Sequence, residues 1–391
     1  MNEDLFYKCS EINDYLIDGD EPKARDLLIQ LLDYVGRNNI QYFPLLNSLI
    51  REVGLYPYMD VNSSEWEDAF VYNLFKADIG LNEEKVLHRE QFRLLSSLLA
   101  GKNIAVSAPT SFGKSFVIDA FIKLRKPRNV AIIVPTIALT DETRRRIYKK
   151  FANEYNIITT TDIPLAERNI FIFPQERALC YVNKIDSLDI LIVDEFYKSS
   201  KDFEKERSAS LIKAIIKLGQ IAKQKYYLAP NITKIEDNQF TKDMEFMKMD
   251  FNTVFLKVTD YYPQIGTDTQ KKGEYFLNLN RTLKGKTLIY AGSFSNITSL
   301  SNLILETSPK IDSVLLNDFS DWLGKNYDYN WNLTLLAKRG VGVHNGSLHR
   351  SLSQIQIKLF EENEGLNRLI STAYSSGYPF SISGDIRSLP S

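Results

Sequence analysis

Short apolar runs alternate with longer charged stretches along most of the chain, from residue 81 onward. The runs are rich in Val, Ile, Phe and Tyr, which favours strands, and the charged stretches between them are long enough for helices. This alternation predicts an α/β fold of parallel sheets with crossover helices. A polar, irregular stretch at 261–273 is predicted to link two series of strands. The predicted strands are 104–106, 130–134, 170–173, 190–193, 226–228 and 254–258 in the first series, and 287–290, 314–316, 341–344 and 369–371 in the second.

The first 80 residues follow a helical pattern instead. Four leucines between positions 27 and 32 recur at helical spacing after Pro22, a residue that suits a helix start. Trp66, Phe70, Leu74 and Phe75 form a second apolar stripe. This segment is predicted to be a separate helical accessory domain, which either packs on the rest of the chain or docks a partner protein. A further helix is predicted over 83–99.

The predicted strand at 104–106 leads into the segment APTSFGKS, residues 108–115, with an apolar run after it. The order strand, tight loop, helix is the setting in which backbone N–H groups and the helix dipole bind phosphate. Lys114 would reach the terminal phosphates, the hydroxyl of Ser115 would hold Mg²⁺, and Gly113 lets the backbone approach closely. The alternative is an ordinary turn with Lys114 as a solvated surface lysine. The predicted phosphate-binding residues are Thr110, Ser111, Gly113, Lys114 and Ser115.

A pair of adjacent carboxylates, Asp194 and Glu195, directly follows the predicted strand at 190–193. Open α/β sheets bind their ligands at the carboxyl ends of their strands. Asp194 could hold Mg²⁺, and Glu195 could position and deprotonate an attacking water. The alternative is that the pair only caps a helix.

Charge is unevenly distributed over the 391 residues, although the formal net charge is only −1. Residues 1–80 hold 15 acidic and 6 basic side chains, and the remainder holds 34 acidic and 42 basic side chains. A modestly basic body permits nucleic-acid binding without proving it. The run Arg144-Arg145-Arg146, with Lys149 and Lys150, is either a phosphate-neutralising surface or a solvated helix face.

Composition also limits the cellular setting. The N-terminus lacks the basic and apolar regions of a secretion signal, and no apolar run approaches the length of a membrane span. Cys9 and Cys180 are the two cysteines, so a disulfide framework is not implied. We therefore expect a cytoplasmic protein with no membrane partner.

These segments together resemble the motifs of superfamily 2 DExD/H-box helicases. APTSFGKS resembles motif I of that family, and DEFY, which starts at Asp194, resembles motif II. LHREQ resembles the upstream segment whose glutamine contacts adenine, which implicates Gln91. The resemblance runs from about residue 81 to residue 377. It implies two P-loop RecA-like domains in tandem, at 81–262 and 263–391, behind the helical domain at 1–80.

Other segments resemble motifs that lie in the nucleic-acid track of the family. VPTIAL resembles motif Ia and FPQER resembles motif Ib, which implicates Pro135, Thr136 and Arg177. KTLIYAGS resembles motif IV, and LIST resembles motif V, which implicates Ser371 and Thr372. YLAPN stands where motif III belongs, but its residues differ. HNG, at 344–346, resembles part of the HH-containing segment of one DExH branch.

The resemblance implies an ATP hydrolase that moves along or remodels nucleic acid, with DNA favoured over RNA. ATP and Mg²⁺ are the implied ligands, and Lys114, Asp194 and Glu195 are the implied catalytic residues. The chain is also similar to helicase subunits encoded in bacterial anti-phage defence loci. Those subunits often work beside a small nuclease-like partner.

Two departures from the family pattern qualify this interpretation. The arginine-rich motif VI has no counterpart after Gly377, where only Arg387 remains, and the fourth residue of motif II is Tyr197. Arginine fingers contribute about 10³- to 10⁵-fold in rate. The second domain is thus predicted to be truncated. The alternatives are a fragment of a longer motor, or a nucleotide-gated nucleic-acid-binding or sensor module with little hydrolysis of its own. An unrelated P-loop kinase or ATPase fits the ordered motifs less well.

Overall fold

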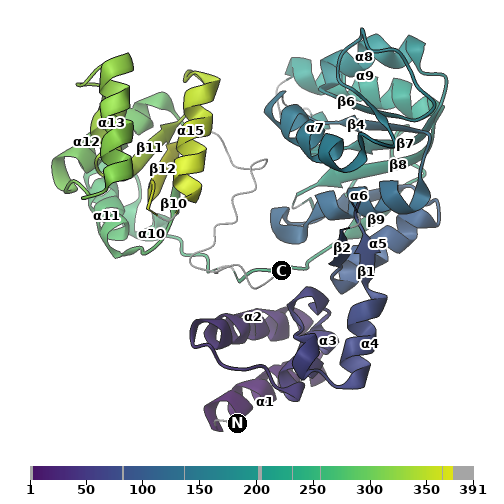
Figure 1. The fold of residues 1–391 in the computed structure, drawn as a ribbon, viewed down its shortest axis with the longest axis horizontal. Helices are drawn as coiled ribbons and strands as arrows, with labels where there is room; N and C mark the ends of the chain where they lie inside the picture. Colours follow the sequence, from purple (N-terminus) through teal and green to yellow (C-terminus); the bar gives the residue numbers. More distant parts are fainter. Residues whose placement is uncertain are drawn as a thin grey trace. The chain divides into compact units, whose positions relative to one another are not determined.

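A computed structural model of the chain describes residues 3–81, 83–135, 137–200, 205–230, 232–255, 257–362 and 364–372 (Figure 1). The chain divides into two compact units, Met1–Leu256 and Lys257–Ser391. The domain boundary that we predicted at residue 80 falls inside the first unit.

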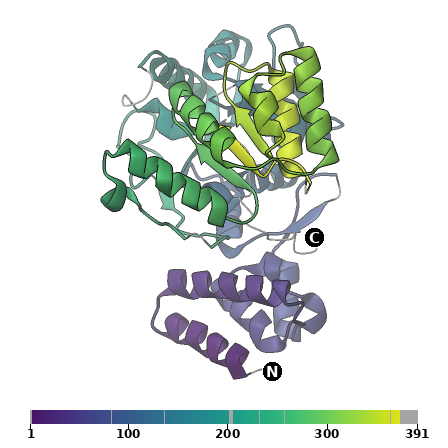
Figure 2. The same cartoon turned by 90° about the vertical axis from the view of Figure 1, so that its left-hand side faces the viewer.

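The N-terminal segment forms a group of short helices, coloured purple in Figure 2. Proline occupies the first turn of both α2 and α3, and the side chain of Asp20 caps α2 by accepting from the backbone N–H of Lys23 at 3.1 Å. Their apolar faces bury Leu28, Leu46 and Ile50 completely. The helices are α1 (Glu3–Ile17), α2 (Glu21–Arg37), α3 (Pro44–Val53) and α4 (Trp66–Leu74), with single 3₁₀ turns η1 (Tyr56–Tyr58) and η2 (Val61–Ser63).

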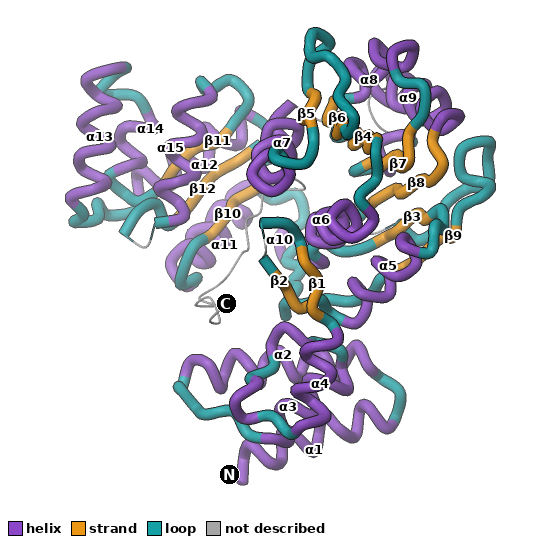
Figure 3. The backbone as a smooth tube through the Cα atoms, turned by 45° about the vertical axis from the view of Figure 1, so that its right-hand side comes forward, coloured by secondary structure: helices purple, strands orange, loops and turns teal. Residues whose placement is uncertain are grey.

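A parallel sheet forms the centre of the first unit. Its seven strands, counted over the described residues, lie in the order β5-β6-β4-β7-β8-β3-β9 and are drawn in orange in Figure 3. All neighbouring pairs are parallel, which confirms the predicted α/β class. The strands are β3 (Ile104–Ser107), β4 (Asn129–Ile133), β5 (Asn156–Ile158), β6 (Asn169–Phe173), β7 (Leu188–Val193), β8 (Ala222–Ala229) and β9 (Glu245–Lys248).

Helices cover both faces of this sheet, and the strand residues alternate between them. Ile190 and Ile192 of β7 pack on one side, whereas Leu191 and Val193 pack on the other. Because both faces are buried, the strands read as continuous apolar runs. The first face is covered by α5 (Arg89–Leu99), α6 (Lys114–Arg125) and α7 (Ile137–Phe151), and the second by α8 (Gln175–Tyr181) and α9 (Lys205–Ile221).

The N-terminal helices share a hydrophobic core with the first face of the sheet. One continuous cluster contains Leu28 of α2, Val106 of β3 and Phe251, which follows β9. The accessory helices therefore pack on the rest of the unit. Their outer surface still exposes Trp66 (73%), Phe70 (58%) and Leu74 (55%), one stripe along α4, so the partner-docking alternative stays a prediction.

Acidification is expected to destabilise this shared core through His88. The imidazole is 7% exposed, and burial and the nearby Arg25 charge lower its pKa from 6.5 to about 3. Between pH 6.5 and about pH 3 the unfolded chain binds a proton at His88 that the folded chain does not bind. Within that range the free energy of unfolding therefore decreases as the pH is lowered, by up to about 1.4 kcal/mol per pH unit from this group.

Urea unfolding of the wild-type chain and of His88→Phe at several pH values between 7 and 4 measures this contribution. The variant is expected to show a shallower fall, because the remaining titrating groups are common to both proteins. Equal slopes for the two proteins would assign the acid sensitivity elsewhere.

The second unit has its own core and sheet. Over its described residues, three parallel strands lie in the order β10-β12-β11. The core includes Ile304, Leu323 and Ile370, each fully buried. The strands are β10 (Thr287–Tyr290), β11 (Val341–His344) and β12 (Arg368–Ser371), and the helices are α10 (Tyr262–Ile265), α11 (Thr269–Thr282), α12 (Phe294–Thr307), α13 (Val314–Asn326), α14 (Asn332–Ala337) and α15 (Arg350–Glu361).

Four local predictions were wrong. Residues 314–316 begin helix α13, because the Ser313 side chain caps its first turn. Described residues within 254–258 form no strand, and the edge position beside β3 is filled by β9 instead. The stretch 261–273 lies between the two series of strands as predicted, but it is not irregular, because it holds α10 and the start of α11. Residues Glu84–Val86 form strand β2, which pairs with β1 (Lys76–Asp78), so the predicted helix over 83–99 begins at Arg89.

No helix among the described residues is long and apolar enough to span a membrane.

Candidate functional site

The predicted phosphate-binding loop lies at the carboxyl end of β3. The chain passes from β3 through a 3₁₀ turn (η3, Thr110–Phe112) into α6. Gly113 joins turn and helix with φ +73° and ψ 38°, a left-handed conformation that favours glycine. The ammonium of Lys114 donates to the carbonyl oxygens of Ala108 at 3.1 Å and Pro109 at 3.2 Å. Lys114 therefore points back into the loop and is not a solvated surface lysine.

Gly113→Ala is expected to damage both the loop and the fold around it. An added Cβ would lie 2.7 Å from Nε2 of Gln91, and its left-handed backbone would cost about 1–2 kcal/mol as well. Gly101→Ala is a matched control, because Gly101 has φ +82° but a Cβ there would meet nothing within 4 Å. We expect urea unfolding to show a larger loss of stability at position 113, with a loss of nucleotide affinity confined to that variant. Equal behaviour of the two variants would contradict the close packing.

The two predicted acidic residues follow β7, a strand that one other strand separates from the loop strand β3. Asp194 directly follows β7, and β8 alone separates β7 from β3 in the sheet. The backbone N–H of Asp194 donates to the carbonyl of Ile133 at 2.9 Å, which fixes the end of the strand. Tyr227 and Ala229 of β8 pair with the ends of β7 and β3, so the YLAPN segment lies between the two halves of the site. Asn231 of that segment lies outside the described residues.

The charges of this site are coupled. Burial lowers the pKa of Lys114, and the carboxylates of Asp194 and Glu195 oppose that shift. Burial raises the pKa of Asp194, the Lys114 charge opposes that shift, and Glu195 adds to it. One half-buried cation thus interacts with two acidic groups, of which Asp194 is half-buried and Glu195 is buried. Charges interact more strongly there than in bulk water. Carboxylate and hydroxyl oxygens are ligands that Mg²⁺ prefers, so Asp194 and Ser115, at the start of α6, fit the predicted metal ion.

Glu195 is held in an unusual conformation. Its backbone has φ +51°, and its side chain is buried, with 3% of the residue exposed. The carboxylate forms an ion pair with Lys198. Glu195 precedes the short 3₁₀ turn η5 (Phe196–Ser199), but its side chain makes no capping hydrogen bond there. Strained backbone of this kind is concentrated at functional sites, so the helix-capping alternative is poorly supported for Glu195.

Gln91 contacts the loop directly. It is 5% exposed, its Oε1 accepts from the backbone N–H of His88 at 2.9 Å, and its Nε2 donates to the carbonyl of Phe112 at 2.6 Å. The sequence contained a signal for the bond to His88, because a glutamine three residues after an N-cap is the capping-box pattern. It contained no such signal for the contact with Phe112. An adenine contact by Gln91 stays a prediction.

Two predicted nucleic-acid residues lie on the same edge of the sheet as the loop. Pro135 follows β4, and Arg177 lies in the first turn of α8 after β6, the neighbour of β4. Arg177 is exposed and donates to the carbonyl of Thr159 at 2.7 Å. Thr136 lies outside the described residues.

The basic run on α7 is partly engaged within the protein. Arg146 and Lys150 both form ion pairs with Asp119 of α6, which is 1% exposed. Arg146 also donates to the backbone carbonyl of Ser115 at 3.3 Å. Arg145 and Lys149 are exposed, so the surface that remains for phosphate contacts is smaller than the run in the sequence indicates.

The predicted residues of the second unit lie at the carboxyl edge of its own sheet. Ser371 ends β12, and its hydroxyl is 3.2 Å from Nδ1 of His344 on β11. Burial lowers the pKa of this histidine. The N–H of Thr372 donates to the carbonyl of His344 at 3.3 Å. The segment after Thr372, with Gly377 and Arg387, lies outside the described residues.

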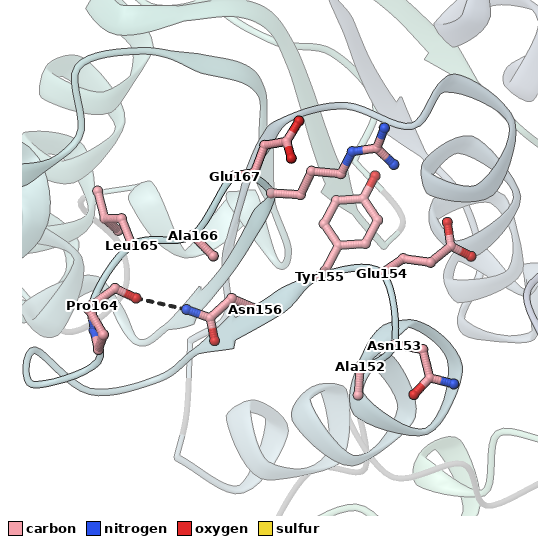
Figure 4. Close-up of a pocket in the computed structure, with 10 residues that line it drawn as sticks. Ala152, Asn153, Glu154, Tyr155, Asn156, Pro164, Leu165, Ala166 and Glu167 are labelled. Atoms are coloured by element: carbon pink, nitrogen blue, oxygen red, sulfur yellow. Dashed lines mark hydrogen bonds between the residues drawn. The ribbon is translucent and has the colours of Figure 1, made fainter.

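A pocket of about 700 Å³ lies in the first unit, at the amino-terminal ends of β5 and β6 (Figure 4). The phosphate-binding loop lies at the carboxyl ends of the strands of the same sheet. The pocket is lined by residues that precede β5 and β6, among them Tyr155, Pro164 and Leu165. The phosphate-binding loop follows the carboxyl end of a parallel strand, so this pocket is not part of the nucleotide site.

Comparison with known proteins indicates the class of protein to which the central part of the chain is similar. Residues 88–228 match the DEAD/DEAH box helicase family, so the chain contains a DEAD/DEAH box helicase domain, which confirms the resemblance seen in its motifs. Residues 1–69 match the Anti-bacteriophage protein B N-terminal domain. The chain is 28% identical over 348 residues to Anti-bacteriophage protein B of Escherichia coli (strain K12), a match that covers 85% of this chain and 46% of that protein. The chain thus spans about half the length of this curated relative.

Proposed function

We propose that this protein is an ATP-dependent nucleic-acid helicase or translocase, directed at DNA rather than RNA, that acts in defence against bacteriophage. The observation that carries the proposal is the geometry at the carboxyl edge of the parallel sheet. Lys114 points back into the loop between β3 and α6, and the Asp194–Glu195 pair follows β7, one strand beyond β8. A defence role is supported by the similarity of residues 1–69 to the Anti-bacteriophage protein B N-terminal domain.

The roles of the loop residues follow from their positions. Backbone N–H groups at the start of α6 bind the phosphates, aided by Thr110 and Ser111 before Gly113. Lys114 leaves the carbonyls of Ala108 and Pro109 to bind the terminal phosphates. In this proposal Gln91 also contacts the adenine.

Ser115 and Asp194 would hold Mg²⁺, which, when bound, neutralises phosphate charge and orients the transferred group. Glu195 orients the attacking water and accepts its proton as the oxygen bonds to phosphorus. The bond from phosphorus to the bridging oxygen then breaks, and ADP leaves with that electron pair. Lys198 forms an ion pair with the Glu195 carboxylate and so orients it.

Nucleic acid would bind along the edge loops through Pro135, Thr136 and Arg177 in the first unit, and Ser371 and Thr372 in the second. Contacts of this kind read the phosphate backbone and are sensitive to salt. The exposed Trp66, Phe70 and Leu74 stripe would dock a protein partner, for which the family resemblance favours a nuclease-like protein.

Steady-state ATP hydrolysis tests the proposal, measured without nucleic acid and with single-stranded DNA, duplex DNA or RNA. Stimulation by DNA that weakens with added salt is the expected result. ATP binding without stimulated hydrolysis would favour the nucleotide-gated sensor, and stimulation by RNA alone would change the substrate.

A further inference from the structure

The segment that follows β9 lies between the N-terminal helices and the phosphate-binding loop. β9 pairs with the loop strand β3, and the N–H of Met249 donates to the carbonyl of Ser107 at 2.8 Å. Phe251 is 1% exposed and belongs to the core shared by the helices and the sheet. We call residues 249–253 the bridging segment.

The N-terminal helices hold the bridging segment at two points. Arg25 of α2, 5% exposed, donates from Nη1 to the carbonyl of Asp250 at 2.8 Å, and its guanidinium lies 4.3 Å from the centre of the Phe251 ring. Tyr58 of η1 donates from its hydroxyl to the carbonyl of Thr253 at 2.9 Å. A buried guanidinium that both donates and stacks is a rigid attachment, because Arg presents a planar group with fixed donor directions.

The bridging segment in turn holds the loop. The hydroxyl of Thr253, a residue 7% exposed, donates to the carbonyl of Ser111 at 3.1 Å. The next carbonyl, that of Phe112, accepts from Gln91. Two successive carbonyls of the loop are therefore engaged by protein donors. This matters for anion binding, because a carbonyl oxygen that turned toward a phosphate would repel it, whereas the N–H groups attract it.

Both carbonyl donors depend on the same contacts with the helices. Gln91 is placed by the backbone of His88, whose ring centre lies 5.6 Å from that of Tyr58 and 5.6 Å from that of Phe251. Thr253 is placed by Tyr58 directly. A displacement of α2 and η1 would therefore release the supports of Ser111 and Phe112 together.

We propose that the N-terminal helices set the conformation of the phosphate-binding loop through the bridging segment, with Thr253 as the positioning residue. ATP affinity then depends on the contacts that Arg25 and Tyr58 make with the bridging segment. A partner that moves these helices would therefore regulate ATP binding. This inference rests on the proposed function, because it takes the loop as the ATP site.

The test compares Thr253→Val with Thr253→Ser in the full chain. Valine keeps the shape but leaves the Ser111 carbonyl without its donor. The Kd of a fluorescent ATP analogue, measured in the presence of Mg²⁺, is therefore expected to rise about tenfold. The KM for ATP should rise in parallel, while kcat changes less than twofold. Serine restores the hydroxyl and is expected to restore affinity to within about threefold of the wild type.

Thr241→Val provides the matched control. Thr241 is 3% exposed, and its hydroxyl donates to the carbonyl of Glu236 at 2.6 Å and accepts from the N–H of Asn238 at 3.1 Å. Its loss therefore removes a donor to a carbonyl elsewhere in the unit and perturbs stability at least as much as the loss at Thr253. This variant is expected to lose stability without a change in Kd. Tyr58→Phe is a second test if Thr253→Val does not fold, and it is expected to raise the Kd about threefold.

The outcomes separate the inference from the proposed function. A wild-type chain that binds no ATP contradicts the proposed function. A wild-type chain that binds ATP, with folded Thr253→Val and Tyr58→Phe proteins of unchanged Kd, overturns the positioning role of Thr253 while the proposed function stands.

Discussion

Lys114→Ala is expected to lower nucleic-acid-stimulated ATP hydrolysis by about 10²- to 10³-fold. Lys114 is the cation whose charge is coupled to Asp194 and Glu195, and burial strengthens that coupling. Without it, the pKa of Asp194 would rise further, because the charge that opposes the effect of burial is gone. A protonated Asp194 is a poor ligand for a divalent cation, so binding of Mg²⁺ with ATP should weaken too.

Steady-state turnover and equilibrium binding of an ATP analogue measure the two losses separately. Lys102→Ala is the matched control, because Lys102 is an exposed lysine paired with Glu245 at the other end of β3. That control should keep wild-type turnover. A Lys114→Ala protein that retains full stimulated activity would remove this loop from the mechanism.

Glu195→Gln is expected to separate ATP binding from hydrolysis. Glutamine keeps the size of the side chain but cannot accept the proton of the attacking water, so kcat should fall by about 10²- to 10⁴-fold. Affinity for ATP should stay within about threefold of the wild type, because the neutral side chain costs no more to bury than the carboxylate. Rapid-quench measurement of a single turnover, beside an ATP-binding titration, checks both parts.

Glu245→Gln is a suitable control for this change, because Glu245 is an exposed carboxylate paired with a lysine on the same sheet. A Glu195→Gln protein with wild-type turnover would place the proton acceptor elsewhere. Loss of ATP binding together with hydrolysis would instead indicate that Glu195 mainly maintains the fold of η5.

The local parts of the site could be predicted from the sequence. The P-loop pattern specifies a strand, a turn and a helix within a dozen residues, and the structure has them in that order. The Asp194–Glu195 pair was found because it follows an apolar run that forms a fully buried strand. The α/β class followed from the same alternation of runs, which depends on burial of both sheet faces.

The non-local parts could not be predicted. The role of Thr253 depends on which strand fills the edge beside β3, and the run at 254–258 looked more strand-like than the polar Glu245–Lys248 segment. Pairing across a sheet is decided by tertiary contacts, which a single sequence does not reveal. The engagement of Arg146 and Lys150 likewise depends on Asp119, 27 residues before Arg146.

A short apolar run was also ambiguous for a local reason. The three apolar residues that open α13 fit a strand or the first turn of a helix equally well. The serine at 313 was the available signal, because its side chain accepts from the backbone N–H of Leu316 at 3.4 Å and so begins the helix.

The attachment of Arg25 to Asp250 has a consequence for synthesis of the protein. The two residues are 225 positions apart, so the N-terminal helices leave the ribosome long before the bridging segment on which they pack has been made. At translation rates of about 5–20 residues per second, this delay lasts roughly 10–45 s. During that time the apolar side chains that later surround Phe251 have no partner surface, which is the situation in which nascent chains recruit chaperones. The N-terminal helices are thus made well before their packing can be completed.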